Sequence, residues 1–290
     1  GMSGADVHYF DVRYVADGVT NSIALIIKNA PLHERLTTLH LSNQGVSVPF
    51  AHALDTTTDE AAPLCIQMLA QKQPQHTNVE RTAWALAEIH AANFGRKPLL
   101  PWLKPADIKF TDNWVIQACW RNAWDRLLNG GGFVDGYGNE HGGPKAGGNF
   151  SAEFTQYTPT LEAAATRFRT AMQTWWQQDD ALTLIHADLH GDHTFTDGHK
   201  TFIIDWGGAQ YGPLYLDLPN YFTREESLLY RAALAELGHN IPEGQFLASY
   251  DAASAYPGFK YFGIGLWNWC YGDPPHQRDN VLHFINMLIE

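Results

Sequence analysis

The chain has 290 residues, of which 45% are hydrophobic, and carries a formal net charge of −12 at pH 7. This length suffices for one large hydrophobic core or two moderate ones. The negative charge argues against a nucleic-acid partner, since such binding relies on cations that neutralise phosphates, and the apolar runs are far shorter than the roughly 20 residues of a membrane span.

The first elements in the chain are a predicted β-hairpin and a helix. β-Branched and aromatic residues concentrate in His8–Val15 and Ser22–Lys28, and the turn-forming pair Asp17-Gly18 separates these two segments. Leucines at helical spacing then predict a helix from Leu32 to Leu41, which ends near Gly45, a residue suited to a helix C-cap.

A change from strand to helix patterns follows. The apolar run Pro63–Leu69 predicts a buried strand, and the polar segment Gln71–Pro74 is interpreted as a connector between two lobes. Beyond the connector, apolar residues at helical spacing predict one helix around Trp84–His90 and another around Ile116–Leu127.

A glycine-rich segment interrupts the helical part. Nine of the twenty-one residues from Asn129 to Asn149 are glycine, but no apolar strand precedes them and no Gly-Lys-Ser/Thr follows. We therefore exclude a phosphate-binding P-loop and interpret the segment as a mobile insertion. A helix is predicted again over Leu161–Gln178, and the chain from Asp217 to Glu290 is mostly helical in pattern.

The segment between these helical parts concentrates ionisable side chains. Five lie within eight residues, directly after the apolar run Leu182–Ile185, in the string His186-Ala-Asp-Leu-His-Gly-Asp-His193. Apolar residues return in Thr201–Ile204 and lead into Asp205, with a predicted turn at Asp197-Gly198. Such a hairpin brings Asp188 and Asp205 near each other.

Two carboxylates at neighbouring strand ends suit phosphoryl transfer. This reaction requires an acceptor hydroxyl held in line with the phosphate, and cations that neutralise the phosphate charge. One carboxylate can orient the hydroxyl while the other holds the metal ion.

The string from His186 to His193 resembles the catalytic loop of the aminoglycoside phosphotransferase and choline kinase family, usually His-Gly-Asp-Leu-His-Pro-Gly-Asn. Ile204–Gly207, with Gly212-Pro213 and Asp217-Leu218 after it, resembles the metal-binding segment of that family and the stretch that follows. The resemblance implies an α+β, protein-kinase-like fold with two lobes.

The resemblance also implies the division of labour between the lobes. Residues 2–71 would form a small, truncated, β-rich lobe that binds the nucleotide, and residues 72–290 a large, mainly α-helical lobe that carries the catalytic hairpin. The implied activity is transfer of the γ-phosphate of ATP, or GTP, with Mg²⁺ to a hydroxyl group of a small-molecule acceptor. The sequence identifies neither that acceptor nor an oligomeric state.

Residue roles follow from the same resemblance. Asp188 would be the catalytic aspartate, Asp205 the magnesium ligand, and His186 and Asp217 structural supports. Ile26-Ile27-Lys28 resembles the strand whose lysine binds the nucleotide phosphates.

Glu34 lies where the helix of that family places the glutamate that pairs with the lysine, and Ala87–His90 resembles a helix of the larger lobe.

Two features depart from the family pattern. His193 occupies the position of an asparagine that ligates magnesium, and an imidazole ligand favours softer ions, so Mn²⁺ is an alternative cofactor. Only one hairpin precedes Lys28, which leaves Asp17–Asn21 as the candidate for a shortened lid over the nucleotide.

Two alternative functions stay open. A kinase-like scaffold with an altered metal ligand would serve as a binding protein without turnover. The string Asp188-x-His190-x-Asp192-His193 also resembles the ligand string of metallo-β-lactamase-type hydrolases, although that string normally lies early in its chain.

The cysteines bear on the cellular compartment. Cys65, Cys119 and Cys270 are far apart, odd in number and surrounded by apolar residues, which argues against disulfides and thiolate zinc sites. Reduced, buried thiols and the lack of a charged-then-apolar leader favour a cytoplasmic protein.

Overall fold

The computed structural model describes residues 7–69, 71–141, 149–178, 181–272 and 274–289. Its contacts group the chain into two compact units, one of Gly1–Lys104 with Leu182–Glu243 and the other of Pro105–Ala181 with Gly244–Glu290. The predicted lobe boundary at residue 71 rests on the change from strand to helix patterns and not on contacts between residues. It stays a prediction.

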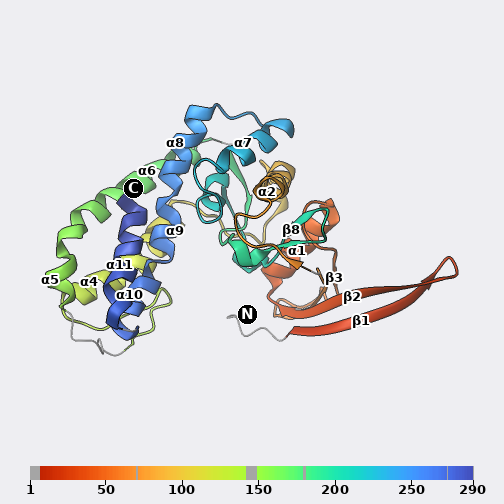
Figure 1. Ribbon diagram of the computed structural model, residues 1–290, viewed down its shortest axis with the longest axis horizontal. Coiled ribbons are helices and arrows are strands. Elements are labelled where there is room, and N and C mark those ends of the chain that lie inside the picture. Colours follow the sequence, from red (N-terminus) through yellow and green to blue (C-terminus); the bar gives the residue numbers. More distant parts are fainter. Residues whose placement is uncertain (1–6, 70, 142–148, 179–180, 273, 290) are drawn as a thin grey trace. The chain divides into compact units, whose positions relative to one another are not determined.

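A four-stranded antiparallel sheet opens the first unit (Figure 1). The strands are ordered β1-β2-β4-β3, and helix α1 follows β2 in the chain. Their bounds are β1 Val7–Ala16, β2 Val19–Ala30, α1 Leu32–Gln44, β3 Ala51–Ala53 and β4 Ala62–Gln67.

The structure confirms the predicted hairpin and the helix after it. Asp17 and Gly18 have φ angles of 51° and 74°, and positive φ at both positions is what a two-residue type I′ turn requires. The strands pair without interruption from Val7↔Lys28 to Ala16↔Val19 and are longer than predicted. Helix α1 ends as predicted at Gly45, whose φ of 71° is left-handed.

The predicted strand around Pro63 is present as β4, but it is not fully buried. Leu64 is buried with Ala30 and Ala51, and Leu39 of α1 packs against this cluster, whereas Pro63 is exposed. An antiparallel sheet commonly packs only one face against the core, so neighbouring residues of β4 have opposite environments. Cys65, which we expected to be buried, is partly exposed for this reason.

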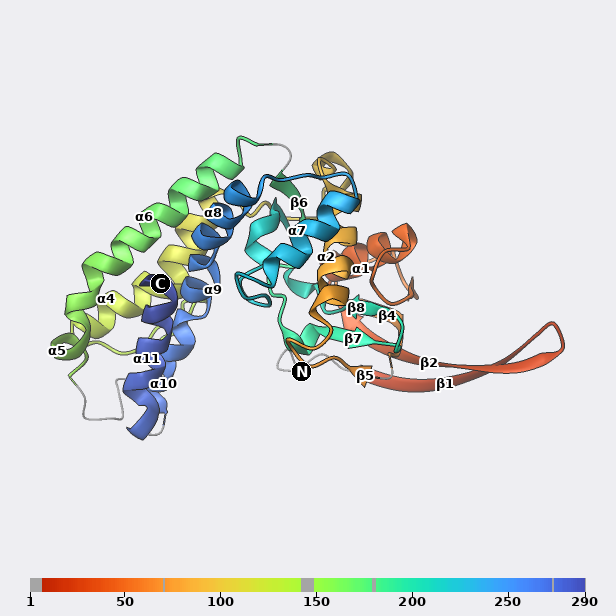
Figure 2. The ribbon, with the colours of Figure 1, turned by 45° about the horizontal axis from the view of Figure 1, so that its top comes forward.

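Two small sheets and two helices complete the first unit. The predicted connector at Gln71 forms a short strand that pairs with the β7–β8 hairpin, in the order β5-β7-β8 (Figure 2). Strand β6 pairs with β9. The bounds are β5 Gln71–Lys72, α2 Val79–Asn93, β6 Leu182–Ile185, β7 Thr194–Thr196, β8 Thr201–Ile203, β9 Gln210–Pro213 and α7 Ser227–Glu236.

Short 3₁₀ turns link these elements. They lie at Lys97–Leu99, Gly191–His193, Trp206–Gly208 and Leu214–Asp217.

The second unit is helical and has an aromatic core. Trp124 packs against Phe150 and Phe262 in edge-to-face contacts, and Trp120 lies beside Phe259. The bounds are α3 Ile108–Phe110, a π-helix Thr111–Arg121, α4 Asn122–Leu128, α5 Phe150–Phe154, a 3₁₀ turn Thr155–Tyr157, α6 Thr158–Trp175, α8 Glu243–Ala253, α9 Ala255–Lys260, α10 Phe262–Tyr271 and α11 Pro274–Ile289.

Only part of the predicted glycine-rich insertion lies in the described part of the chain. Val134 and Glu140 form a bridge, and the Asp135 carboxylate accepts hydrogen bonds from the backbone N–H groups of Tyr137 and Asn139. The remainder of the predicted insertion, residues 142–148, lies outside the described residues. No helix among the described residues is long and apolar enough to cross a membrane.

Candidate active site

Asp217 holds the beginning of the predicted catalytic loop, His186–His193. Its two carboxylate oxygens accept the backbone N–H groups of His186 and Ala187, each at 2.7 Å, and the side chain is fully buried. Ala187 has a left-handed φ of 62°, a strained conformation for a residue with a Cβ. The two hydrogen bonds stabilise this turn, and the turn sets the direction in which Asp188 leaves the strand.

A second histidine supports Asp217 from α2. His90 Nε2 lies 3.2 Å from Asp217 Oδ2, and His90 Nδ1 lies 2.7 Å from the Tyr230 hydroxyl. Both side chains of the His90–Asp217 pair are fully buried. Asp217 is thus the centre of a buried polar network, and its role as a structural support stays a prediction.

His186 joins the two sides of the predicted catalytic hairpin. Its Nε2–H group donates to the carbonyl oxygen of Ile204 at 2.8 Å, while Nδ1 accepts the backbone N–H of Asp188 at 3.3 Å. Burial lowers the pKa of His186 to about 4, although the nearby Asp217 charge acts in the opposite direction. A neutral imidazole therefore connects the loop that carries Asp188 with the residue before Asp205.

Lys28, Glu34 and Asp205 form a charged group drawn from three elements. Lys28 Nζ of β2 lies 2.6 Å from Glu34 Oε1 of α1 and 3.2 Å from Asp205 Oδ1, in the turn after β8. Burial by itself lowers the pKa of Lys28, but the two carboxylates outweigh it and the net pKa is raised. Burial raises the pKa of the Asp205 carboxyl, but the charge and hydrogen bond of Lys28, together with the nearby His193 and His186, outweigh burial and the net pKa is lowered.

His193 lies against this charged group. Its Nδ1–H donates to the backbone carbonyl of Asp188 at 2.9 Å, so that a neutral ring presents a lone pair at Nε2. Nε2 is 3.5 Å from Asp205 Oδ2. A nitrogen lone pair and a carboxylate oxygen repel unless a cation, either a proton or a metal ion, lies between them.

The spacing of these two atoms fits a shared metal ion. Ligand atoms bound at about 2.1 Å lie roughly 3.0 Å apart when the bonds are perpendicular and slightly farther apart in a tetrahedral arrangement. The carboxylate suits Mg²⁺ and the imidazole suits softer divalent ions, so the donor set fits Mn²⁺ as well as Mg²⁺.

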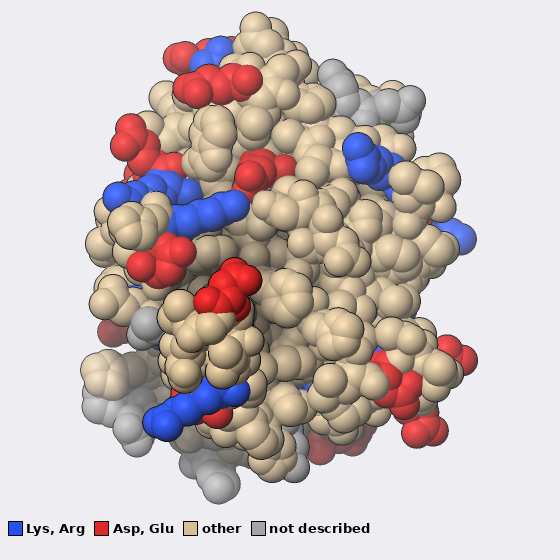
Figure 3. Space-filling view, turned by 90° about the vertical axis from the view of Figure 1, so that its right-hand side faces the viewer, with Lys and Arg blue, Asp and Glu red and all other residues tan. Residues whose placement is uncertain are grey.

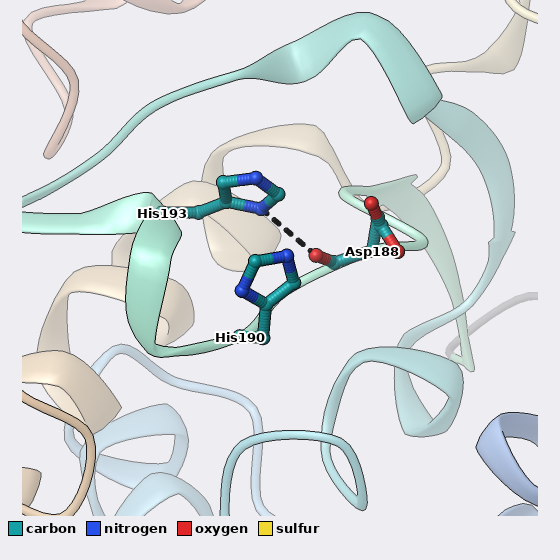
Figure 4. Close-up of side chains that lie close together, drawn as sticks. All are labelled: Asp188, His190 and His193. Atoms are coloured by element: carbon teal, nitrogen blue, oxygen red, sulfur yellow. Dashed lines mark hydrogen bonds between the residues drawn. The ribbon is translucent and has the colours of Figure 1, made fainter. Parts of the chain in front are cut away.

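His190 is a residue whose place in the site the kinase interpretation missed. One ligand atom each of Asp188, His190 and His193 lie within 4.8 Å of one another, and the two rings have centroids 3.8 Å apart (Figure 4). His190 Nδ1 accepts the backbone N–H of Asp192, which fixes the ring. The sequence signal that could have identified His190 is its position three residues before His193 in a tight loop.

The Asp192 side chain is not part of this cluster. Its carboxylate is exposed and forms an ion pair with Lys72 of β5. The ligand string considered for a metallohydrolase needs this carboxylate beside the histidines, and the cluster found among the described residues does not include it.

A further missed residue supports the turn that follows Asp205. His33 Nε2–H of α1 donates to the carbonyl oxygen of Gly207 at 2.7 Å. Gly207 also lies close to Glu34, because a Cβ atom added to this glycine would be 3.4 Å from Glu34 Oε2. The first turn of α1 thus positions both the lysine-pairing carboxylate and the turn after Asp205, a contact between distant segments that no local pattern predicts.

Comparisons with known proteins bear on the family and the fold of the chain. The model of the phosphotransferase enzyme family (APH) matches residues 32–256. A search of curated proteins gave no match.

Solved structures resemble the chain over most of its length. They include an aminoglycoside phosphotransferase from Alicyclobacillus acidocaldarius (15% identity, 95% of this chain and 87% of that chain covered, TM-score 0.58). A choline kinase from Cryptosporidium parvum has 11% identity, coverage of 96% and 88%, and a TM-score of 0.57. A spectinomycin phosphotransferase in complex with ADP and spectinomycin has 14% identity, coverage of 98% and 89%, and a TM-score of 0.52. These likenesses confirm the predicted protein-kinase-like fold class.

Proposed function

We propose, because the chain belongs to the phosphotransferase enzyme family, that it transfers the γ-phosphate of ATP to a hydroxyl group of a small molecule. The observation that carries this proposal is the convergence of Lys28, Glu34 and Asp205 beside the catalytic loop. Asp205 lies 177 residues after Lys28 in the sequence. The charges of the three residues match the needs of a nucleotide with a bound metal ion.

Each residue has a separate role in the proposed reaction. Lys28 contacts the nucleotide phosphates, and Glu34 holds its ammonium group in place. Asp205 and His193 would hold Mg²⁺ or Mn²⁺, which when bound would neutralise charge on the phosphoryl group.

Asp188 orients the acceptor hydroxyl and accepts its proton. The backbone of Asp188 is fixed on both sides, because its N–H donates to His186 and its carbonyl accepts from His193. A carboxylate on so constrained a backbone suits the in-line attack that phosphoryl transfer requires.

A thermal-shift screen would identify the nucleotide and the acceptor. ATP, GTP, Mg²⁺, Mn²⁺ and a panel of amino-alcohols and sugars are added singly and in pairs, because a ligand that binds the native state raises the unfolding midpoint. A pair of nucleotide and metal that raises the midpoint supports the proposal. The ADP complex of the similar spectinomycin phosphotransferase favours an adenine nucleotide.

Replacement of Asp205 by Ala is expected to remove the metal-dependent part of the ATP thermal shift and to leave the metal-independent part. Without this carboxylate, His193 alone faces the ion. Asp192→Ala is the matched control, since Asp192 is an exposed carboxylate of the same hairpin that pairs with Lys72. Equal loss in both variants, or none in Asp205→Ala, would contradict a metal site at Asp205.

Replacement of His193 by Asn is expected to change the preferred metal. The wild-type protein should bind ATP more tightly with Mn²⁺ than with Mg²⁺, because nitrogen ligands suit the softer ion, and the asparagine variant should shift towards Mg²⁺. ATP titrations with each metal measure the ratio of the two affinities. The same ratio in both proteins would show that His193 does not contact the metal.

We also propose a cytoplasmic location. ATP-dependent chemistry fits this compartment, and the cysteines are free thiols, as is usual in reducing surroundings.

A further inference from the structure

Strand β1 has an open edge. It lies at one end of the four-stranded sheet, and among the residues that the structure describes its only strand neighbour is β2. Strand β4 pairs with β2 only over Leu25–Ala30, so within the described part of the chain the ribbon from Asp11 to Ala24 consists of two strands. A two-stranded ribbon is marginally stable in water, and stability normally requires another strand or a packed face.

The same ribbon exposes many large apolar side chains. Tyr9 and Val15 are 66% and 71% exposed. Others along the ribbon are Val7, Phe10, Val12, Tyr14 and Val19. Figure 3, which looks at the side from which the ribbon projects, shows a mostly uncharged surface there.

This edge lacks the usual protection against pairing. Natural edge strands carry prolines, bulges or like charges that prevent association with other strands. β1 contains no proline, its pairing with β2 is uninterrupted, and its charged residues are Asp11 and Arg13, which have opposite signs.

The turn decides which backbone groups face outward. In a two-residue hairpin the residues that flank the turn, here Ala16 and Val19, exchange hydrogen bonds, and such pairs recur at every second position. Even-numbered residues of β1 therefore direct their N–H and C=O groups to β2. Odd-numbered residues, including Asp11 and Arg13, direct theirs to the open edge.

We propose that two copies of this chain form a two-fold symmetric dimer in which their β1 strands pair antiparallel, with the symmetry axis at Val12. In this register Asp11 of each copy lies opposite Arg13 of the other, and these two odd-numbered residues exchange backbone hydrogen bonds. The two edges supply a continuous sheet in the order β2-β1-β1-β2.

Charge selects this register over its neighbours. A shift that centres the pair on Asp11 places two aspartates opposite each other, and a shift that centres it on Arg13 opposes two arginines; like charges directly opposite destabilise a sheet. Centring on Val12 instead gives two opposite-charge pairs. On the other face, Phe10 of each copy then lies opposite Tyr14 of the other, a pair of aromatic side chains that favours cross-strand association.

The test is the molar mass of the full chain and its charge variants by sedimentation equilibrium over a concentration series. In a dimer of Asp11→Arg, an arginine lies opposite an arginine at two places, and in a dimer of Arg13→Asp an aspartate lies opposite an aspartate at two places. Each variant alone should therefore dimerise at least about tenfold more weakly than the wild type. The β2 neighbours of these positions, Ala24 and Ser22, are uncharged, so neither variant meets a new charge within its own hairpin.

Mixing provides the decisive comparison. An equimolar mixture of Asp11→Arg and Arg13→Asp restores both opposite-charge pairs and should form a heterodimer, and the double variant should dimerise like the wild type. Asp59→Arg, at an exposed loop position, is the control that should leave dimerisation unchanged. A monomeric wild type, or single variants that dimerise as strongly as the wild type, would overturn the proposal.

Hydrogen exchange distinguishes a second copy from a segment of the same chain. In the dimer, the amides of Asp11 and Arg13 should exchange slowly, and dilution to monomer should accelerate them while the amide of Val12, bonded to β2, changes less. Slow exchange at Asp11 and Arg13 in a monomeric protein would show that the chain covers its own edge and would contradict the dimer.

Discussion

Replacement of Asp188 by Asn is expected to lower acceptor-dependent turnover by about 10²-fold or more, which is the usual scale for removal of a general base. Asparagine has nearly the same shape but cannot accept the acceptor proton. The fold and nucleotide affinity should remain, because the backbone bonds of this residue to His186 and His193 do not involve its carboxylate. The measurement is acceptor-dependent ADP release at saturating ATP, with the midpoint of unfolding recorded for each protein.

Asp192→Asn is the matched control for this experiment. It makes the same chemical change four residues later, at an exposed side chain that pairs with Lys72. We expect nearly wild-type turnover from it. Equal turnover in wild type and Asp188→Asn would exclude Asp188 from the reaction.

Replacement of Asp217 by Ala is expected to reduce the free energy of unfolding by about 3–5 kcal/mol, the range for breaking a buried charged pair. The buried carboxylate accepts the N–H groups of His186 and Ala187 and contacts His90, so its loss leaves several buried donors without acceptors. Urea unfolding followed by fluorescence measures the difference.

Asp197→Ala is the control for this prediction, because the Asp197 carboxylate also accepts two backbone N–H groups, from His199 and Lys200, but at an exposed turn. Water replaces an exposed acceptor, so its loss should cost much less. Should Asp217→Ala fail to fold, Asp217→Asn retains one acceptor oxygen and should still be less stable than Asp197→Ala. Equal stability of the Asp217 and Asp197 variants would contradict the buried network.

Local patterns were enough to predict much of the fold. Segments rich in β-branched and aromatic residues on either side of Asp17-Gly18 gave the hairpin, and leucine spacing with Gly45 gave α1 and its end, because turns and helix caps depend on residues close in sequence. The π-helix Thr111–Arg121 was not predicted, since apolar spacing over three turns does not distinguish it from an α-helix. The strand at Gln71 was also missed, because its partner Thr196 is distant in the chain.

The candidate site was predictable where a motif is contiguous. The segments around Asp188 and Asp205 are short strings of characteristic residues. His33 contributes through its contact with Gly207, and such a contact between remote segments leaves no trace in local periodicity or spacing. The roles proposed for Lys28, Asp188 and the other site residues are predictions that the variants above test.

The most direct test of phosphoryl transfer follows the γ-phosphate itself. ATP labelled with ¹⁸O in the γ-phosphate is incubated with the protein, Mg²⁺ or Mn²⁺ and the acceptor panel, and the products are analysed by mass spectrometry. We predict a labelled phosphoryl group on the hydroxyl of an acceptor with wild-type protein, and its near absence with Asp188→Asn. Metal-dependent ATP binding without a labelled acceptor from any member of a broad panel would contradict a kinase and favour the binding-protein alternative.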